Sequence, residues 1–178
     1  HETASEYAKK ILELDPEDRK VNHHLTEYYQ ALFNHTDQMD YYYKALPYAT
    51  KQLEIFPESC YYYVERGILY QDGYELEKAL ADFKKAAELK PDDVYAYANW
   101  GLTLQLMDRV EESVEILEKS VELLHSSGEH TSFPLTCLAK TYVMLGRFDE
   151  AVALSQEVLN NYPTHSRADL CRIYRRMG

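Results

Sequence analysis

The sequence predicts an all-α fold of stacked antiparallel helix pairs, with about ten helices in the chain. The first observation behind this prediction is composition, because only 6 glycines stand among many Ala, Leu, Glu and Lys residues, which favour helix. The second is a pattern of small residues, aromatic residues and proline that recurs about every 34 residues. A two-helix unit cannot bury its own apolar face, so neighbouring units are expected to stack.

The clearest copy of the pattern is the 34-residue segment 60–93. Its small residues are Gly67, Ala79 and Ala86 at positions 8, 20 and 27, its aromatics are Tyr70 and Phe83 at 11 and 24, and Pro91 stands at 32. This arrangement resembles the tetratricopeptide repeat at every signature position. The resemblance implies that the small residues let two helices pack closely and that the aromatics fill the space between them. It also implies a right-handed α-α superhelix (solenoid) with a concave surface.

The same frame divides the chain into repeats within a single domain, residues 1–178. They are a half-repeat 1–16, four copies 19–57, 60–93, 94–127 and 132–165, and a half-repeat or capping helix 166–178. The first copy is longer than the others, and we expect its surplus between its two helices, at residues 34–40. The four extra residues 128–131 are expected in a connecting loop, and Pro47 near a helix start or a kink.

Helix boundaries are marked by proline followed by an acid or a hydroxyl. The three segments are Pro16-Glu17-Asp18, Pro57-Glu58-Ser59 and Pro91-Asp92-Asp93. Each is expected to stop one helix and to cap the next.

Several function classes are disfavoured by the sequence. The net charge of −11 argues against nucleic-acid binding, and no stretch of about 18 apolar residues predicts insertion into a membrane. No metalloprotease, CxxC, Walker or glycine-rich phosphate motif occurs, so we expect no enzyme, no cofactor and no metal. The adjacent His23 and His24 are expected to point to different sides of a helix and not to chelate together.

The three cysteines, Cys60, Cys137 and Cys171, are odd in number and far apart in the sequence. Reduced thiols in a cytoplasmic protein are the favoured interpretation. The chain does not begin with Met, so a removed leader stays an open alternative.

The resemblance places the binding groove on the first helix of each copy, mainly at positions 2, 5, 9, 12 and 13. The candidate groove residues are Tyr61, Val64, Ile68, Tyr95, Ala98, Leu102, Gln105, Phe133, Thr136 and Lys140. Position 2 is aromatic in three successive copies, which predicts an apolar trough for an extended or helical peptide. The alternative is that these aromatics pack on the neighbouring repeat and are covered.

One subfamily of these repeats clamps the C-terminal carboxylate of heat-shock chaperones with Lys at position 5 and Asn at position 9. The corresponding pairs are His23/Glu27, Val64/Ile68, Ala98/Leu102 and Thr136/Lys140. A carboxylate would lack its charge-assisted hydrogen bonds here, so we do not expect this type of partner.

The expected function is therefore a non-catalytic scaffold that binds a peptide or a partner protein. A second hypothesis is head-to-tail self-association through the terminal half-repeats, because residues 164–178 carry a charge of +3 and residues 1–16 a charge of −2. Two further interpretations of the ends stay open, namely a fragment of a longer array and a pair of capping helices.

Overall fold

The computed structural model describes residues 4–162 and is helical nearly throughout that range. Its helices are α1 (Ala4–Leu14), α2 (Arg19–Thr36), α3 (Met39–Ile55), α4 (Cys60–Asp72), α5 (Leu76–Leu89), α6 (Val94–Leu106), α7 (Val110–Ser127), α8 (Phe133–Met144) and α9 (Phe148–Asn161). The expected tenth helix, 166–178, lies outside the described residues. Within 4–162, no helix is both long and apolar enough to cross a bilayer.

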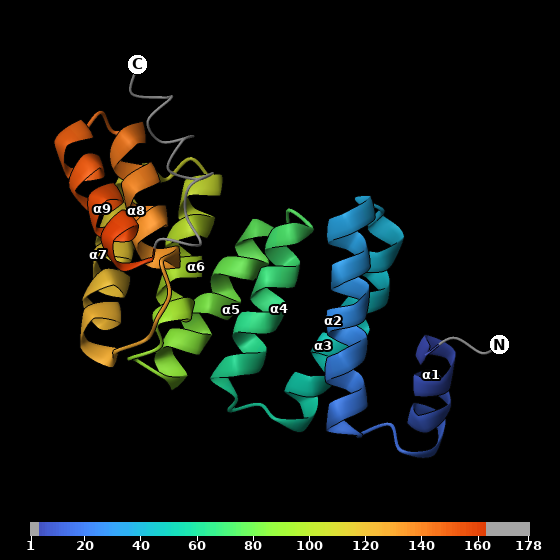
Figure 1. The fold of residues 1–178 in the computed structure, drawn as a ribbon. Helices are drawn as coiled ribbons and strands as arrows, with labels where there is room; N and C mark the ends of the chain where they lie inside the picture. The colour runs from blue at the N-terminus through green and yellow to red at the C-terminus, as the bar shows by residue number, and fades with distance from the viewer. Residues whose placement is uncertain (1–3, 163–178) are drawn as a thin grey trace. The chain divides into compact units, whose positions relative to one another are not determined.

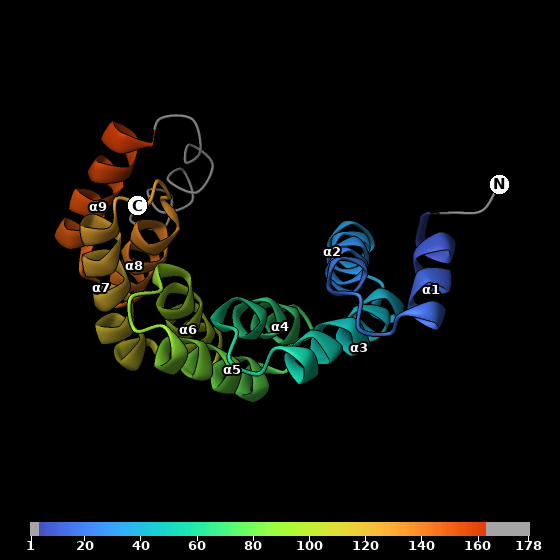
Figure 2. The same ribbon diagram turned by 90° about the horizontal axis from the view of Figure 1, so that it is seen from below.

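The chain forms two compact units, His1–Leu89 and Lys90–Gly178, each described by itself. In the first unit α2 lies beside α3 and α1 packs on α2 (Figure 1). In the second unit α8 lies beside both α7 and α9 (Figure 2). The single-domain expectation stays a prediction.

Two of the three predicted helix caps are confirmed. Asp18 and Asp93 each accept a hydrogen bond of 2.9 Å from a backbone N–H of the first turn, of Val21 and Ala96 respectively. This contact satisfies one of the donors that a helix start leaves unpaired. Ser59 precedes α4 without a side-chain cap bond, so the third signal marks a boundary but no cap.

Close packing of the α4–α5 and α6–α7 pairs depends on a glycine. A Cβ atom at Gly67 would lie 2.6 Å from Cε1 of Phe83, the aromatic at position 24 of the same copy. A Cβ atom at Gly101 would likewise overlap Leu117. In these two pairs the glycine therefore lets the first helix approach the large residue of the second.

The expected position of the surplus residues in the first copy is wrong. Only Asp37 and Gln38 separate α2 from α3, which contain 18 and 17 residues. The surplus residues lengthen both helices instead. Helix α2 continues past the buried Phe33 and ends before Asp37, which adopts a φ of 55°. Pro47 lies in the interior of α3, so the expected position near a helix start is wrong, and the alternative of a kink stays a prediction. Residues 128–131 do lie between α7 and α8, as expected.

Candidate functional site

The candidate groove residues all lie on the first helix of a pair, but they divide between the two units. Tyr61, Val64 and Ile68 belong to α4 in the first unit. The other seven belong to α6 and α8 in the second unit. Three candidates thus belong to one unit and seven to the other.

In the second unit, five of the seven candidates line one open pocket of about 460 Å³, which we call the α6–α8 pocket. Its lining residues are Tyr95, Leu102, His130, Thr131, Ser132, Phe133, Thr136, Cys137, Lys140 and Tyr162. Tyr95 and Phe133 occupy position 2 of successive copies. The pocket thus joins equivalent aromatics of two repeats.

The α6–α8 pocket is lined by both apolar and polar side chains. Leu102 and Phe133 are half-buried and pack on the hydrophobic core of the second unit. Tyr95 is 42% exposed, so its ring is available to a ligand. Two further lining residues, His130 and Tyr162, have ring centres 4.8 Å apart. Such a surface can hold an apolar side chain and offers polar groups around it.

Two candidates of the second unit have another role. Ala98 is 0% exposed, so the prediction that it is an exposed groove residue is wrong. Gln105 does not line the pocket. Its Nε2 donates to the backbone oxygen of Cys137 at 3.2 Å and to Thr141 Oγ1. These bonds tie α6 to α8. Gln105 therefore positions the two pocket helices relative to each other.

Tyr61, in the first unit, has charged surroundings in contrast to the apolar trough expected there. It is 57% exposed and lines an open pocket of about 1070 Å³, the α2–α4 pocket. The other lining residues are Asp15, Glu17, Asp18, Arg19, Lys20, His23, His24 and Tyr62. Partial burial and the negative charges of Glu65 and Glu27 raise the pKa of Tyr61 to about 12. Val64 and Ile68 are half-buried and do not line this pocket.

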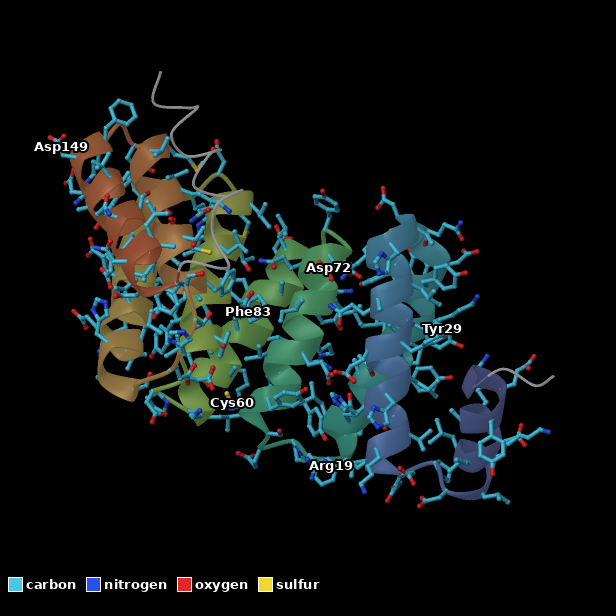
Figure 3. The ribbon with its side chains drawn as sticks, in the orientation of Figure 1. Arg19, Tyr29, Cys60, Asp72, Phe83 and Asp149 are labelled. Atoms are coloured by element: carbon cyan, nitrogen blue, oxygen red, sulfur yellow. The ribbon has the colours of Figure 1, made fainter. Side chains whose placement is uncertain are left out.

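Sequence reasoning missed a row of polar contacts that joins α2 to α4. Figure 3 shows Arg19 near the start of α2 and Asp72 at the far end of α4. The three contacts run from Arg19 Nε to the Tyr62 hydroxyl at 2.8 Å, from His23 Nδ1 to Glu65 Oε1 at 2.8 Å, and from Gln30 Nε2 to Asp72 Oδ2 at 3.0 Å.

The spacing of this row is the signal that could have revealed it. Its partners are 42 or 43 residues apart, one or two more than the 41 between corresponding positions of the first two copies. Burial raises the pKa of the Glu65 carboxyl, and the neighbouring His23 opposes this shift. Burial likewise raises the pKa of Asp72 against the hydrogen bond from Gln30. In both contacts a partly buried carboxyl of α4 thus faces a donor of α2 that is 42 residues earlier in the chain.

Models of known protein families identify the family of this chain. Two models described as tetratricopeptide repeat match residues 61–93 and 93–164, and together they span more than half of the chain. The chain belongs to the tetratricopeptide repeat family. The resemblance found in segment 60–93 is thereby confirmed.

Curated relatives of this tetratricopeptide repeat chain match it over part of their length. A TPR repeat-containing protein of Methanocaldococcus jannaschii is 30% identical over 113 residues, which are 64% of this chain and 18% of that protein. The UDP-N-acetylglucosamine–peptide N-acetylglucosaminyltransferase of Giardia intestinalis is 34% identical over 79 residues, 42% of this chain and 5% of the enzyme. The chain therefore spans less than a fifth of these relatives.

Solved structures confirm the all-α solenoid of antiparallel helix pairs. A thermophilic TPR protein of Thermus thermophilus is 21% identical with a TM-score of 0.74, covering 98% of this chain and 89% of its own. MamA is 17% identical with a TM-score of 0.71, covering 94% and 99%. YrrB, a TPR protein with an unusual peptide-binding site, is 17% identical with a TM-score of 0.61, covering 98% and 92%. At these identities the likeness shows the fold alone.

Tetratricopeptide repeats in general bind proteins and are non-catalytic, so the family supports an interaction scaffold. The transferase activity of the Giardia relative belongs to a protein of which this chain spans 5%. A cytoplasmic location, the absence of a nucleic-acid partner and the exclusion of chaperone tails stay predictions.

Proposed function

We propose that the chain is a non-catalytic scaffold that binds a peptide segment of a partner protein in the α6–α8 pocket. The observation that carries the proposal is that Tyr95 and Phe133, from successive repeats, line one pocket together with Leu102. An apolar side chain of the peptide would lie on Leu102 and Phe133. Tyr95 would then cover that side chain.

The energetics favour an anchor of this kind. Burying one Leu, Ile or Phe side chain of a peptide contributes about 1.5–3 kcal/mol. Aromatic residues add large, rigid contact area at low entropic cost and are common binding hot spots. YrrB, a protein of the same fold, has a peptide-binding site, which supports this class of ligand for our chain.

A displayed peptide library provides the test. Peptides enriched on the full chain should share an apolar or aromatic anchor, and their affinity should be measured by calorimetry. Tyr95→Ala should weaken binding about tenfold, a loss of about 1.4 kcal/mol. The control is Tyr43→Ala, which removes an exposed tyrosine of α3 outside both pockets and should leave affinity unchanged.

The peptide experiment has outcomes that would reject this site. No enriched peptide, or peptides that bind the Tyr95→Ala protein as tightly as the original, would reject the α6–α8 pocket as the site. Tyr61→Ala should also leave affinity unchanged, because Tyr61 lies in the charged α2–α4 pocket. Circular dichroism should show intact helicity in all three variants.

Self-association is the second candidate, favoured by one feature of α1. Tyr7 and Leu14 are largely exposed on this terminal helix, although Ala8 and Leu12 pack on the core of the first unit. A second copy could cover them. The other half of the expected contact, residues 166–178, lies outside the described residues. Light scattering across a concentration range tests this, and a strict monomer at high concentration would reject it.

A further inference from the structure

Two adjacent histidines of α2 converge on one carboxylate. The expectation that His23 and His24 point to different sides is wrong, because their ring centres lie 5.6 Å apart. One potential metal-ligand atom from each of His23, His24 and Glu27 lies within 4.8 Å of the others. Glu27 follows His23 by four residues and His24 by three, so it can reach both rings from one helix face.

The distances match a metal coordination shell. His23 Nε2 lies 3.5 Å from Glu27 Oε2, and His24 Nδ1 lies 3.6 Å from the same oxygen. Ligand atoms bound to Zn²⁺ at about 2.0–2.2 Å in a tetrahedron are about 3.4 Å apart. The two histidine-to-carboxylate distances therefore already match the edges of such a tetrahedron, and the ligand atoms of the two histidines lie within 4.8 Å of each other.

A second carboxylate orients the first histidine. Nδ1 of His23 lies 2.8 Å from Glu65 Oε1 of α4, and the tautomer in which Nδ1 donates to this carboxylate leaves the Nε2 lone pair for a metal ion beside Glu27. The Glu65 side chain is nearly buried, and the Tyr61 ring contacts His23 edge-on at 5.8 Å. A carboxylate that holds the second nitrogen of a ligating histidine fixes its tautomer and raises its basicity. This support comes from a different repeat and is independent of the spacing on α2.

The charge around the cluster also favours a cation. Both histidines line the α2–α4 pocket, whose walls carry three acids, Asp15, Glu17 and Asp18, against two bases, Arg19 and Lys20. Glu27 adds a further acid at the site itself. The exposure of His24, 72% of its side chain, leaves the approach open.

We propose that His23, His24 and Glu27 bind a divalent transition-metal ion, Zn²⁺ in particular, with Glu65 as a positioning residue. Two imidazoles and one carboxylate suit Zn²⁺, and three protein ligands leave a fourth position for water or for a donor atom of a bound molecule. The site lies in the first unit and does not depend on the peptide pocket of the second.

The test is calorimetric titration of the full chain with ZnCl₂, together with the visible spectrum of the Co²⁺-substituted protein. One ion should bind per chain, and Co²⁺ should show the intense bands of tetrahedral coordination. His24→Ala and Glu27→Gln should each weaken Zn²⁺ binding at least about tenfold and abolish these bands. Both positions are solvent-exposed, so the variants should keep their fold.

Two further variants separate this site from general histidine binding and from a structural role. Glu65→Gln keeps the size of the side chain and should weaken binding about tenfold. His125→Ala removes an exposed histidine that pairs with Glu157 at 2.7 Å, and it should leave binding unchanged. The proposal is overturned if no single saturable site appears, if His24→Ala binds as tightly as the original, or if His125→Ala loses as much affinity.

Discussion

The two units place different chemistry along the first helices of their repeats. Along α2 and α4 the contacts are polar, from Arg19–Tyr62 to Gln30–Asp72, and the adjoining pocket is charged. Along α6 and α8 the pocket contains Tyr95, Leu102 and Phe133. The fold constrains the small and aromatic positions between helices and leaves the outer positions free to acquire a site.

The same contrast occurs inside the helix pairs. Arg66 and Asp82, at positions 7 and 23 of the second copy, form a two-point ion pair with both distances 2.8 Å. Asp82 is 5% exposed, and the pair raises the pKa of the Arg66 guanidinium. The third copy has Trp100 and Ile116 at these positions. A buried ion pair and an apolar pair therefore serve equivalent places in the two units.

The largest loss of folding stability is expected at the two glycines that allow close helix packing, one in each unit. Gly67→Leu and Gly101→Leu should each cost about 3 kcal/mol, because the new side chain overlaps Phe83 or Leu117. Urea unfolding measures the loss, and hydrogen exchange should show α4 and α5 opening first in Gly67→Leu. Ala81→Leu, at an exposed site of α5, is the control and should stay within about 0.5 kcal/mol. A loss below about 1 kcal/mol for both glycine variants would contradict the packing argument.

An intermediate loss of folding stability is expected at repeat positions 7 and 23, where the second and third copies differ. Asp82→Ile alone should cost about 2 kcal/mol, because it leaves the half-buried Arg66 without its partner. The double variant Arg66→Trp with Asp82→Ile copies the third repeat and should recover most of that loss. Chemical denaturation of the two singles and the double gives the coupling energy. Additive losses would show that the two positions act independently of each other.

The smallest expected effect is on the pH dependence of folding stability. It concerns two tyrosines that donate to carboxylates, Tyr42 to Glu75 in the first unit and Tyr142 to Glu118 in the second. Burial and this hydrogen bond raise the pKa of Tyr142 to about 12 and that of Tyr42 further. An unfolded tyrosine ionises near pH 10, so the stabilisation is complete below about pH 10 and is lost as pH rises to about 12.

Tyr142→Phe should therefore reduce the alkaline loss of stability between about pH 10 and 12, and Tyr42→Phe should reduce it more. Denaturant unfolding at several pH values measures the slopes. Tyr43→Phe, at an exposed site next to Tyr42, should leave the slope unchanged. Identical slopes in all variants would contradict the assigned pKa shifts.

Much of the fold could be predicted because its signals are local. Proline followed by an acid marks the starts of α2 and α6, and Asp18 and Asp93 do cap them. The resemblance of segment 60–93 implied close helix packing at Gly67, and Gly67 does face the ring of Phe83. The length of α2 could not be predicted, since it depends on how far the core extends beneath Phe33.

The candidate site could be predicted only as a set of helix positions. The resemblance to tetratricopeptide repeats singled out Tyr95, Leu102, Phe133, Thr136 and Lys140, and these five residues line the α6–α8 pocket. Only the tertiary structure decided that Ala98 is buried, that Gln105 binds α8 and that Tyr61 faces charged residues. It also brought Glu65 against His23, beside His24 and Glu27. The physical reason is that helix spacing assigns a residue to a face, whereas its partners come from another repeat through packing.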